Sequence, residues 1–360
     1  MKFRWRILFF LIGLAGIGVM IWQGVFDGAE WSKLTESSVL ILFAEIIGIW
    51  LLIYLIHAWA YKVILGSESK NVHMHSMLRI CIAGFALNNV TPAGLIGGEP
   101  YRIMALRRYI PTTKAASATL TFSIFYALGH FMLWATGAII YACYGCPGEL
   151  WVDLMILISG AILLGIVIWS FFAHNIGFTY PFMRFLAKIP LLRRKLAPAV
   201  ERKKESYIEI DDNMRAFRNE GWRYFVVLGL QYSTRLLEAF EYFLLLRFFA
   251  PDPSSFNYLH GLMIMATASL VGNLLFIIPM QAGSRELGTS IALGFIGLTT
   301  GVLGNMVVVY RIREMLFIIV GIILVLTGRK YKKRHPQAYE TKEESAPPTV
   351  DAVPVTENKK

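Results

Sequence analysis

The chain has 360 residues, of which 56% are hydrophobic and only 16% are charged. Soluble domains carry about 25% charged residues, so this composition excludes an ordinary soluble enzyme or binding domain. The formal net charge of +11 could indicate a nucleic-acid-binding protein, but the basic residues are confined to particular loops between apolar stretches. The composition therefore predicts an integral membrane protein with no nucleic-acid partner.

Six apolar stretches are long enough to cross a bilayer as helices. They cover 7–26, 39–61, 115–141, 151–173, 224–249 and 306–328. Because about 20 apolar residues span the hydrocarbon core, we expect about six full transmembrane helices. The basic residues at 1–6 resemble the start of a signal peptide, but no clear small-residue cleavage site follows. We therefore interpret 7–26 as an uncleaved first span.

The basic residues are distributed unequally between the two sides of these spans. Of 35 Lys and Arg, 26 fall in 1–6, 62–79, 102–114, 174–223 and 329–335, whereas the opposite connections contain only Lys33. Loops rich in Lys and Arg face the cytoplasm, so we expect both termini there, in a bacterial cytoplasmic membrane. The same loops should attract anionic lipid headgroups.

Two segments carry glycine, proline and charge inside apolar surroundings. The candidate substrate-binding residues of the first segment are Asn89, Thr91, Pro92, Gly97, Gly98, Glu99 and Arg102. Those of the second segment are Pro279, Gly283, Arg285 and Glu286. The spans on either side predict that the two segments enter the membrane from opposite faces. We therefore expect two oppositely oriented re-entrant helical hairpins, an inverted repeat whose breaks build a transporter's binding site.

The chemistry at these breaks favours an anionic ligand. Free N–H groups at a helix start present partial positive charge, and arginine suits bidentate contacts with phosphate. We expect Arg102 and Arg285 to attract a lipid phosphate. The alternative, which the sequence leaves open, is an ion pair from Arg285 to Glu99 or Glu286 that locks the hairpins together.

Further charged residues lie within the spans themselves. Arg235 and Glu238 are three residues apart in one span, as are Arg311 and Glu314 in the last, so each pair can form along its own helix. An internal salt-bridge network is the favoured interpretation, and a role in binding substrate or in proton coupling is the alternative. For Glu45, in the second span, we favour a buried hydrogen bond.

The remaining cysteines and histidines are expected to have structural roles and not catalytic ones. Cys143 and Cys146 could form a local disulfide in an outer loop, and His57 and His130 are expected to pack inside the bundle. His73 lies two residues from another histidine, but without further ligands nearby we predict no metal site and no cofactor. Residues 174–222 are expected to form a cytoplasmic amphipathic connector and 330–360 a disordered tail.

These motifs together resemble the flippase-like transmembrane region of the lysylphosphatidylglycerol synthase family. The resemblance covers roughly 5–330 and rests on the order of three motifs, at 89–102, at 279–286 and at 309–311. It implies one flippase-like transmembrane domain over 1–329. Met280 and Gln281 depart from the pattern, because they stand where the family usually has two glycines. No soluble aminoacyl-transferase domain accompanies the motifs, so the resemblance implies lipid translocation rather than lysyl transfer.

The expected function is translocation of an anionic phospholipid or glycolipid between leaflets. We therefore expect a transporter in preference to an enzyme. Two alternatives remain open from the sequence. One is an integral-membrane transferase acting on polyprenyl-phosphate or phospholipid, and the other is a non-catalytic partner of a cell-envelope enzyme. The expected partners are membrane lipids, with a second copy of the chain or such an enzyme as the candidate protein partners.

Overall fold

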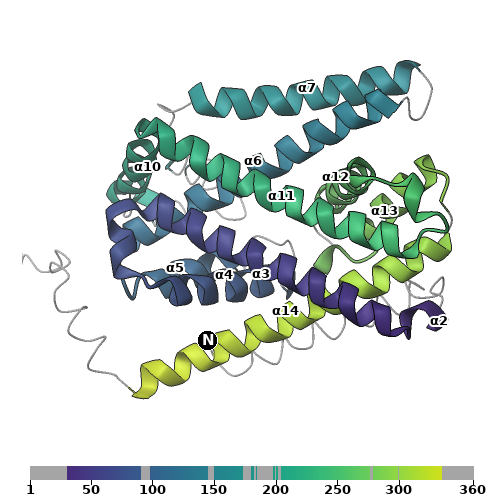
Figure 1. Cartoon of the computed structure of the whole chain (residues 1–360). Coiled ribbons are helices and arrows are strands. Elements are labelled where there is room, and N and C mark those ends of the chain that lie inside the picture. Colours follow the sequence, from purple (N-terminus) through teal and green to yellow (C-terminus); the bar gives the residue numbers. More distant parts are fainter. Residues whose placement is uncertain are drawn as a thin grey trace, which may run out of the picture.

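A computed structural model shows a bundle of α-helices, with no strand among the residues that it describes (Figure 1). The described residues are 31–90, 98–144, 150–172, 180–181, 184, 198, 200–201, 204–275, 279–298 and 300–334. The first expected span and residues 335–360 of the expected tail lie outside these ranges, whereas residues 330–334, expected to be disordered, belong to the last helix. Within them the all-α fold is confirmed.

Five long helices correspond to the remaining expected spans. They are α3 (Ser37–Leu65), α6 (Thr112–Tyr144), α7 (Leu150–Phe172), α11 (Gly221–Phe249) and α14 (Thr300–Arg334). In the described part of the chain, three helical stretches are long and apolar enough to cross a membrane: Ser37–Asn71, Thr112–Tyr144 and Asp153–Phe171. Helices α11 and α14 are long enough, with 29 and 35 residues, but buried charged side chains lower their hydropathy.

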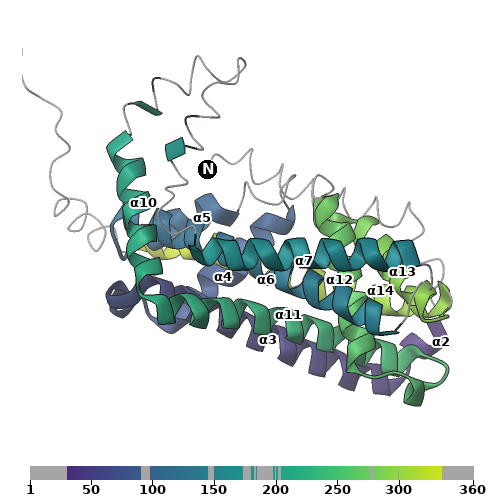
Figure 2. The same cartoon turned by 90° about the horizontal axis from the view of Figure 1, so that it is seen from above.

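The long helices form layers around a common core. Helices α3 and α11 lie side by side in both Figure 1 and Figure 2, and α6 packs against α11 and α7. Helix α7 is outermost, and its Met155, Ile158, Ile162 and Trp169 side chains are exposed. Because water would penalise such a continuous apolar face, this surface fits contact with lipid chains.

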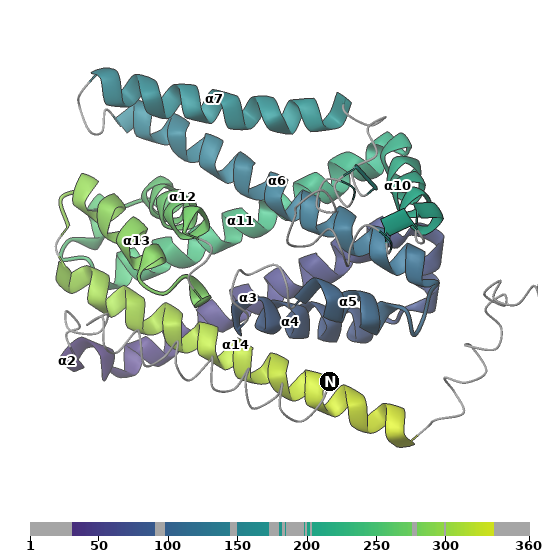
Figure 3. The ribbon, with the colours of Figure 1, turned by 180° about the vertical axis from the view of Figure 1, so that it is seen from behind.

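Each interrupted segment folds into two short helices that pack together. In the first, α4 (Met74–Val90) contacts α5 (Gly98–Leu106). In the second, α12 (Tyr258–Leu274) contacts α13 (Ser284–Phe295), and the short 3₁₀ turn η4 (Pro279–Gln281) lies between them. Figure 3 shows the two hairpins on opposite sides of the bundle centre, with α14 running past both. Helix α14 packs closely on α4 and also contacts α13.

The described part of the connector is a packed helix. Helix α10 (Lys204–Asn219) contacts α6 and α11, and its Ile210, Met214 and Phe217 side chains are buried. Residues 204–219 therefore form an amphipathic helix bound to the bundle and not a solvated connector. The Cys143–Cys146 pair falls partly outside the described residues, since Cys146 lies in 145–149; Cys143 is exposed at the end of α6.

The close contact between α4 and α5 depends on Gly98. A Cβ atom at Gly98 would lie 2.3 Å from Asn88 Oδ1 and 2.4 Å from the Gly84 carbonyl oxygen. The second contact is with backbone, so α5 would have to move away from α4. We predict that Gly98→Ala lowers stability by about 1–3 kcal/mol, as overpacking does. Thermal melting of the purified protein in detergent measures this loss.

A glycine in open surroundings supplies the matched control. A Cβ atom at Gly48, on α3, would meet nothing within 4 Å. Gly48→Ala should therefore leave the melting temperature unchanged or raise it slightly, because alanine restricts the unfolded chain and favours helix. Equal melting temperatures for the Gly98→Ala and Gly48→Ala variants would contradict the proposed role of Gly98.

Candidate functional site

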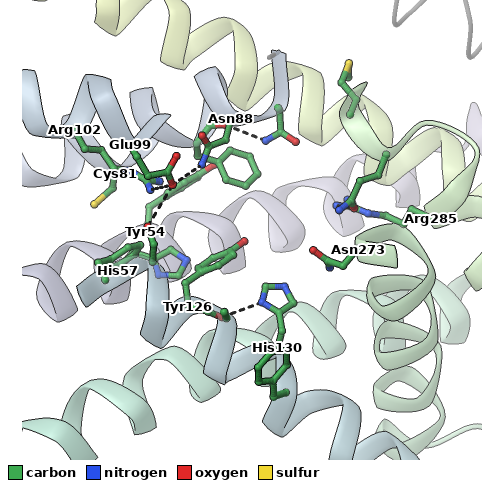
Figure 4. A pocket seen from close by; sticks show the side chains of 18 of the residues that line it. Tyr54, His57, Cys81, Asn88, Glu99, Arg102, Tyr126, His130, Asn273 and Arg285 are labelled. Atoms are coloured by element: carbon green, nitrogen blue, oxygen red, sulfur yellow. Dashed lines mark hydrogen bonds and ion pairs between the residues drawn. The ribbon is translucent and has the colours of Figure 1, made fainter. Parts of the chain in front are cut away.

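A cavity of about 440 Å³ lies between the two interrupted segments (Figure 4). Its walls come from α3, α4, α5 and α6 on one side and from the α12–α13 hairpin on the other. The lining residues are Tyr54, His57, Cys81, Phe85, Asn88, Asn89, Glu99, Arg102, Phe122, Ser123, Tyr126, Ala127, His130, Phe131, Trp134, Asn273, Met280, Gln281 and Arg285. The cavity thus brings together residues from both breaks, as expected for a site shared by two halves.

Glu99 and Arg102 form the charged part of the first wall. Arg102 Nη1 lies 3.3 Å from Glu99 Oε1, and Asn88 and Ser123 donate to the same oxygen at 3.3 and 3.4 Å. The second oxygen, Glu99 Oε2, is buried and has no hydrogen-bond partner among the described residues. The Arg102 guanidinium also lies 5.4 Å from the Phe122 ring. The pair is therefore held in place by its neighbours at one end of the cavity.

At the N-terminus of α5, a backbone N–H is hydrogen-bonded to a side chain of α4. The Gly98 N–H donates to Asn88 Oδ1 at 2.7 Å, so this N–H is not available to the anionic group expected there. Asn89 lines the cavity, and its side-chain nitrogen donates to the Phe85 carbonyl at 3.1 Å. The other candidates of this break, Thr91, Pro92 and Gly97, lie outside the described residues.

Arg285 forms the charged part of the second wall. Its side chain is 23% exposed, lies 3.6 Å from Glu314 and donates to Gln281 Oε1 at 3.0 Å. The alternative ion pair from Arg285 to Glu99 or Glu286 is not formed, because the partner of Arg285 in the structure is Glu314. Figure 4 places Arg285 and Arg102 at opposite ends of the cavity. Arg285 is therefore the more accessible of the two lining arginines, with the weaker ion pair.

Arg311 and Glu286 satisfy the broken backbone behind this wall. Arg311 Nη1 donates to the Met280 carbonyl at 3.0 Å, and Arg311 Nε donates to Glu286 Oε1 at 2.6 Å. The other Glu286 oxygen accepts from the Gly283 N–H at 2.8 Å, where a φ of 82° suits glycine. Pro279 begins the 3₁₀ turn η4, just before these residues. Glu286 and Arg311 lie behind the cavity and stabilise the break.

The charged residues of the spans form the expected internal network. Arg235 pairs with Glu238 at 2.8 Å and Arg311 with Glu314 at 2.6 Å, each along its own helix. A third pair, Arg313 with Glu241 at 2.9 Å, joins α14 to α11. Arg235 and Glu238 line a smaller chamber of about 70 Å³. It shares six lining residues with the cavity: Phe85, Tyr126, His130, Asn273, Gln281 and Arg285. Glu314, like Arg311, is buried outside the cavity lining.

The positions of three further residues test the expectations drawn from the sequence. His57 and His130 are buried as expected, but both also line the cavity, and Arg235 Nη1 donates to His130 Nε2 at 3.2 Å. Glu45 is exposed on α3, so the expectation of a buried hydrogen bond at this carboxylate is wrong. It lies on the helix face that also exposes Ile41 and Leu52, because residues four and seven apart share one face of a helix.

An aromatic stripe on α6 supplies most of the remaining wall. Phe122, Tyr126, His130 and Trp134 recur every four residues, and neighbouring rings lie 6.3, 4.8 and 5.8 Å apart. Residues four apart share one helix face, so this spacing was visible in the sequence as a candidate lining face. Long apolar helices contain many aromatic residues, and the spacing alone does not distinguish a cavity wall from a packed one.

The chain matches a known family of membrane domains over most of its length. A family model described as the lysylphosphatidylglycerol synthase TM region matches residues 7–321. The chain belongs to this family. It is a family of membrane domains of the lysylphosphatidylglycerol synthase type, which implies a lipid-related role in the membrane. No curated protein matches the chain.

Met280 and Gln281, which stand where the resemblance implies two glycines, have an unusual backbone conformation. Met280 and Gln281 have φ angles of 57° and 51°, the left-handed region that glycine adopts without cost. The backbone at the break is therefore kept in the conformation that glycines would adopt, although this chain places side chains there. Met280 packs with Val90, Ala282 and Ile318, and Gln281 holds Arg285.

The positive φ at Gln281 predicts that glycine is more stable than alanine at this position, the reverse of their usual order within a helix. Gln281→Gly and Gln281→Ala both remove the hydrogen bond to Arg285, but only glycine relieves the positive φ. We predict that the glycine variant is more stable than the alanine variant by about 1–2 kcal/mol. In an ordinary helix alanine would be the more stable residue. Thermal melting of both variants measures the difference, and an alanine variant of equal or greater stability would contradict it.

The buried charge network leads to a second prediction. Arg311→Leu leaves the Glu286 carboxylate without its guanidinium partner, leaves Glu314 with only the longer pair to Arg285, and removes the donor to the Met280 carbonyl. Breaking a buried pair in this way should cost about 3–5 kcal/mol, seen as a lower melting temperature or loss of folded protein. The control is Asp212→Asn, which removes an exposed ion pair to Arg215 at 3.2 Å. That change should cost about 0–1 kcal/mol. Similar losses in both variants would contradict a stabilising role for Arg311.

Proposed function

We propose that this protein translocates a lipid with an anionic headgroup between the leaflets of the bacterial cytoplasmic membrane. The observation that carries the proposal is the cavity between the two interrupted segments, with one arginine from each half in its wall. A polar cavity within a bundle of apolar helices gives a headgroup a path that avoids hydrocarbon. The acyl chains would remain in lipid beside the exposed apolar helix faces.

Arg285 is the proposed contact for the anionic group. It is the more exposed of the two lining arginines, and its ion pair to Glu314 is 3.6 Å long, while Glu314 also pairs with Arg311 at 2.6 Å. An incoming anion can therefore bind Arg285 without leaving Glu314 unpaired. Arginine is well suited to phosphate because its donors match two phosphate oxygens at once. Arg102 is the corresponding contact in the first half.

The orientation in the membrane belongs to the same proposal. The basic connections favour an orientation with both termini and α10 on the cytoplasmic side, in which the two breaks would be re-entrant hairpins that enter from opposite faces. Arg102 and Arg285 would contact a headgroup from opposite ends of the cavity. Residues of both hairpins would thus contribute to one path across the membrane.

A liposome assay tests this function directly. We predict that the purified protein moves labelled phosphatidylinositol or phosphatidylglycerol across liposome membranes, and that Arg285→Gln slows this movement at least about tenfold by removing a charge-assisted contact. Glu314 keeps Arg311 as partner in this variant, so the fold should survive. Arrival of the label at the outer leaflet, followed by its reduction with dithionite, measures the rate.

An exposed arginine provides the control. Arg247 lies in the last turn of α11, away from the cavity, and is exposed. Arg247→Gln should move lipid at the rate of the unmodified protein. Equal rates for the unmodified protein, Arg285→Gln and protein-free liposomes would overturn lipid translocation for these lipids. Equal and rapid movement in the two variants would overturn the role of Arg285.

A further inference from the structure

The cavity extends along α6 between its two arginines. The lining residues of α6 run from Phe122 to Trp134, which corresponds to about 18 Å of helix at 1.5 Å per residue. Arg102 lies over Phe122 at one end. At the other end, Trp134 Nε1 donates to Ser269 Oγ at 3.2 Å, and Asn273 donates to the same oxygen at 3.3 Å. The space between the arginines therefore has room for a headgroup larger than phosphate alone.

The aromatic wall does not suit a cationic headgroup. Aromatic faces attract cations, but here the protein's own guanidinium groups take this role: Arg102 lies 5.4 Å from the Phe122 ring and Arg235 4.5 Å from Tyr126. Among the charged residues that line the cavity, Arg102 and Arg285 outnumber Glu99, and Glu99 is paired with Arg102. An ammonium group in this space would meet repulsion from both ends.

The uncharged polar groups of the wall offer acceptors. The side-chain nitrogen of Asn273 donates to the Ser269 carbonyl at 2.8 Å, and that of Asn89 donates to the Phe85 carbonyl at 3.1 Å. A carbonyl can only accept, so these contacts fix which atom of each amide is nitrogen and leave both side-chain oxygens as acceptors for a ligand, with one further N–H at Asn89. Glu99 Oε2 is a third acceptor without a partner among the described residues. Phosphate oxygens cannot satisfy these acceptors, whereas hydroxyl groups can.

We infer that the headgroup carried by this cavity is a phosphate joined to an uncharged sugar or cyclic polyol, and that headgroups bearing an amine or quaternary ammonium are excluded. The phosphate binds Arg285, the hydroxyls donate to Asn89, Asn273 and Glu99, and the apolar faces of the ring lie along the α6 stripe. This inference rests on the proposed function, because it names the substrate class for the same site.

Liposomes with matched acyl chains test the headgroup class. The series consists of labelled phosphatidylinositol, phosphatidic acid, phosphatidylcholine and lysylphosphatidylglycerol. Phosphatidylinositol should move at least about tenfold faster than the other three. A site built to bind hydroxyl groups disfavours phosphatidic acid and phosphatidylcholine, which lack them, and the two arginines repel the amines of lysylphosphatidylglycerol. Movement of phosphatidylcholine or lysylphosphatidylglycerol at the phosphatidylinositol rate would overturn the inference.

An asparagine variant tests the acceptor role. Asn273→Ala should slow phosphatidylinositol several-fold and leave the slower rate of phosphatidic acid unchanged, so the ratio of the two rates falls. The control is Asn219→Ala, at the exposed end of α10, which should leave the ratio unchanged. An unchanged ratio in Asn273→Ala overturns the inference.

The outcomes separate the two proposals. Rapid movement of phosphatidic acid and phosphatidylinositol at equal rates would support anionic lipid translocation and overturn the sugar or polyol class. Movement of none of the four lipids above protein-free liposomes would overturn the proposed function itself, together with the inference that rests on it. Selective movement of phosphatidylinositol would support both.

Discussion

Pairing of buried charge is the constraint on which this structure depends. In the second half of the chain, four arginines (Arg235, Arg285, Arg311 and Arg313) lie against four glutamates (Glu238, Glu241, Glu286 and Glu314), with pair distances up to 3.6 Å. A lone charge in such surroundings costs several kcal/mol, so each member of the set requires the others. The network ties α11, α13 and α14 into one body and sets the back wall of the cavity.

The same network permits irregular backbone inside an apolar bundle. Peptide groups outside a helix must find partners when water is absent. At the second break, Arg311 donates to the Met280 carbonyl and Glu286 accepts from the Gly283 N–H. At the first break, Asn88 accepts from the Gly98 N–H. Side chains thus replace the missing helical hydrogen bonds, and this leaves Arg285 and the amides of the wall facing the cavity.

Much of this arrangement follows from local sequence patterns, and the rest depends on packing. The apolar runs predict α3, α6, α7, α11 and α14, and spacing of three residues predicts the pairs Arg235–Glu238 and Arg311–Glu314. The pairs Arg285–Glu314 and Arg313–Glu241 join residues from different helices, so no local pattern reveals them. The place of His130 in the cavity wall likewise follows from the packing of α6 against α11.

The hydrogen bond from Arg285 to Gln281 has a consequence for the proposed transport cycle. The carboxamide oxygen occupies a donor of the guanidinium that a lipid phosphate would otherwise take, and so acts as an internal surrogate for the ligand. A hydrogen bond that involves a charged group contributes about 1.5–3 kcal/mol, and an anion that binds Arg285 replaces it with a contact between two charged groups. If the proposed translocation is correct, the guanidinium therefore stays hydrogen-bonded through the lipid-free half of the cycle, and lipid and carboxamide exchange at a single donor.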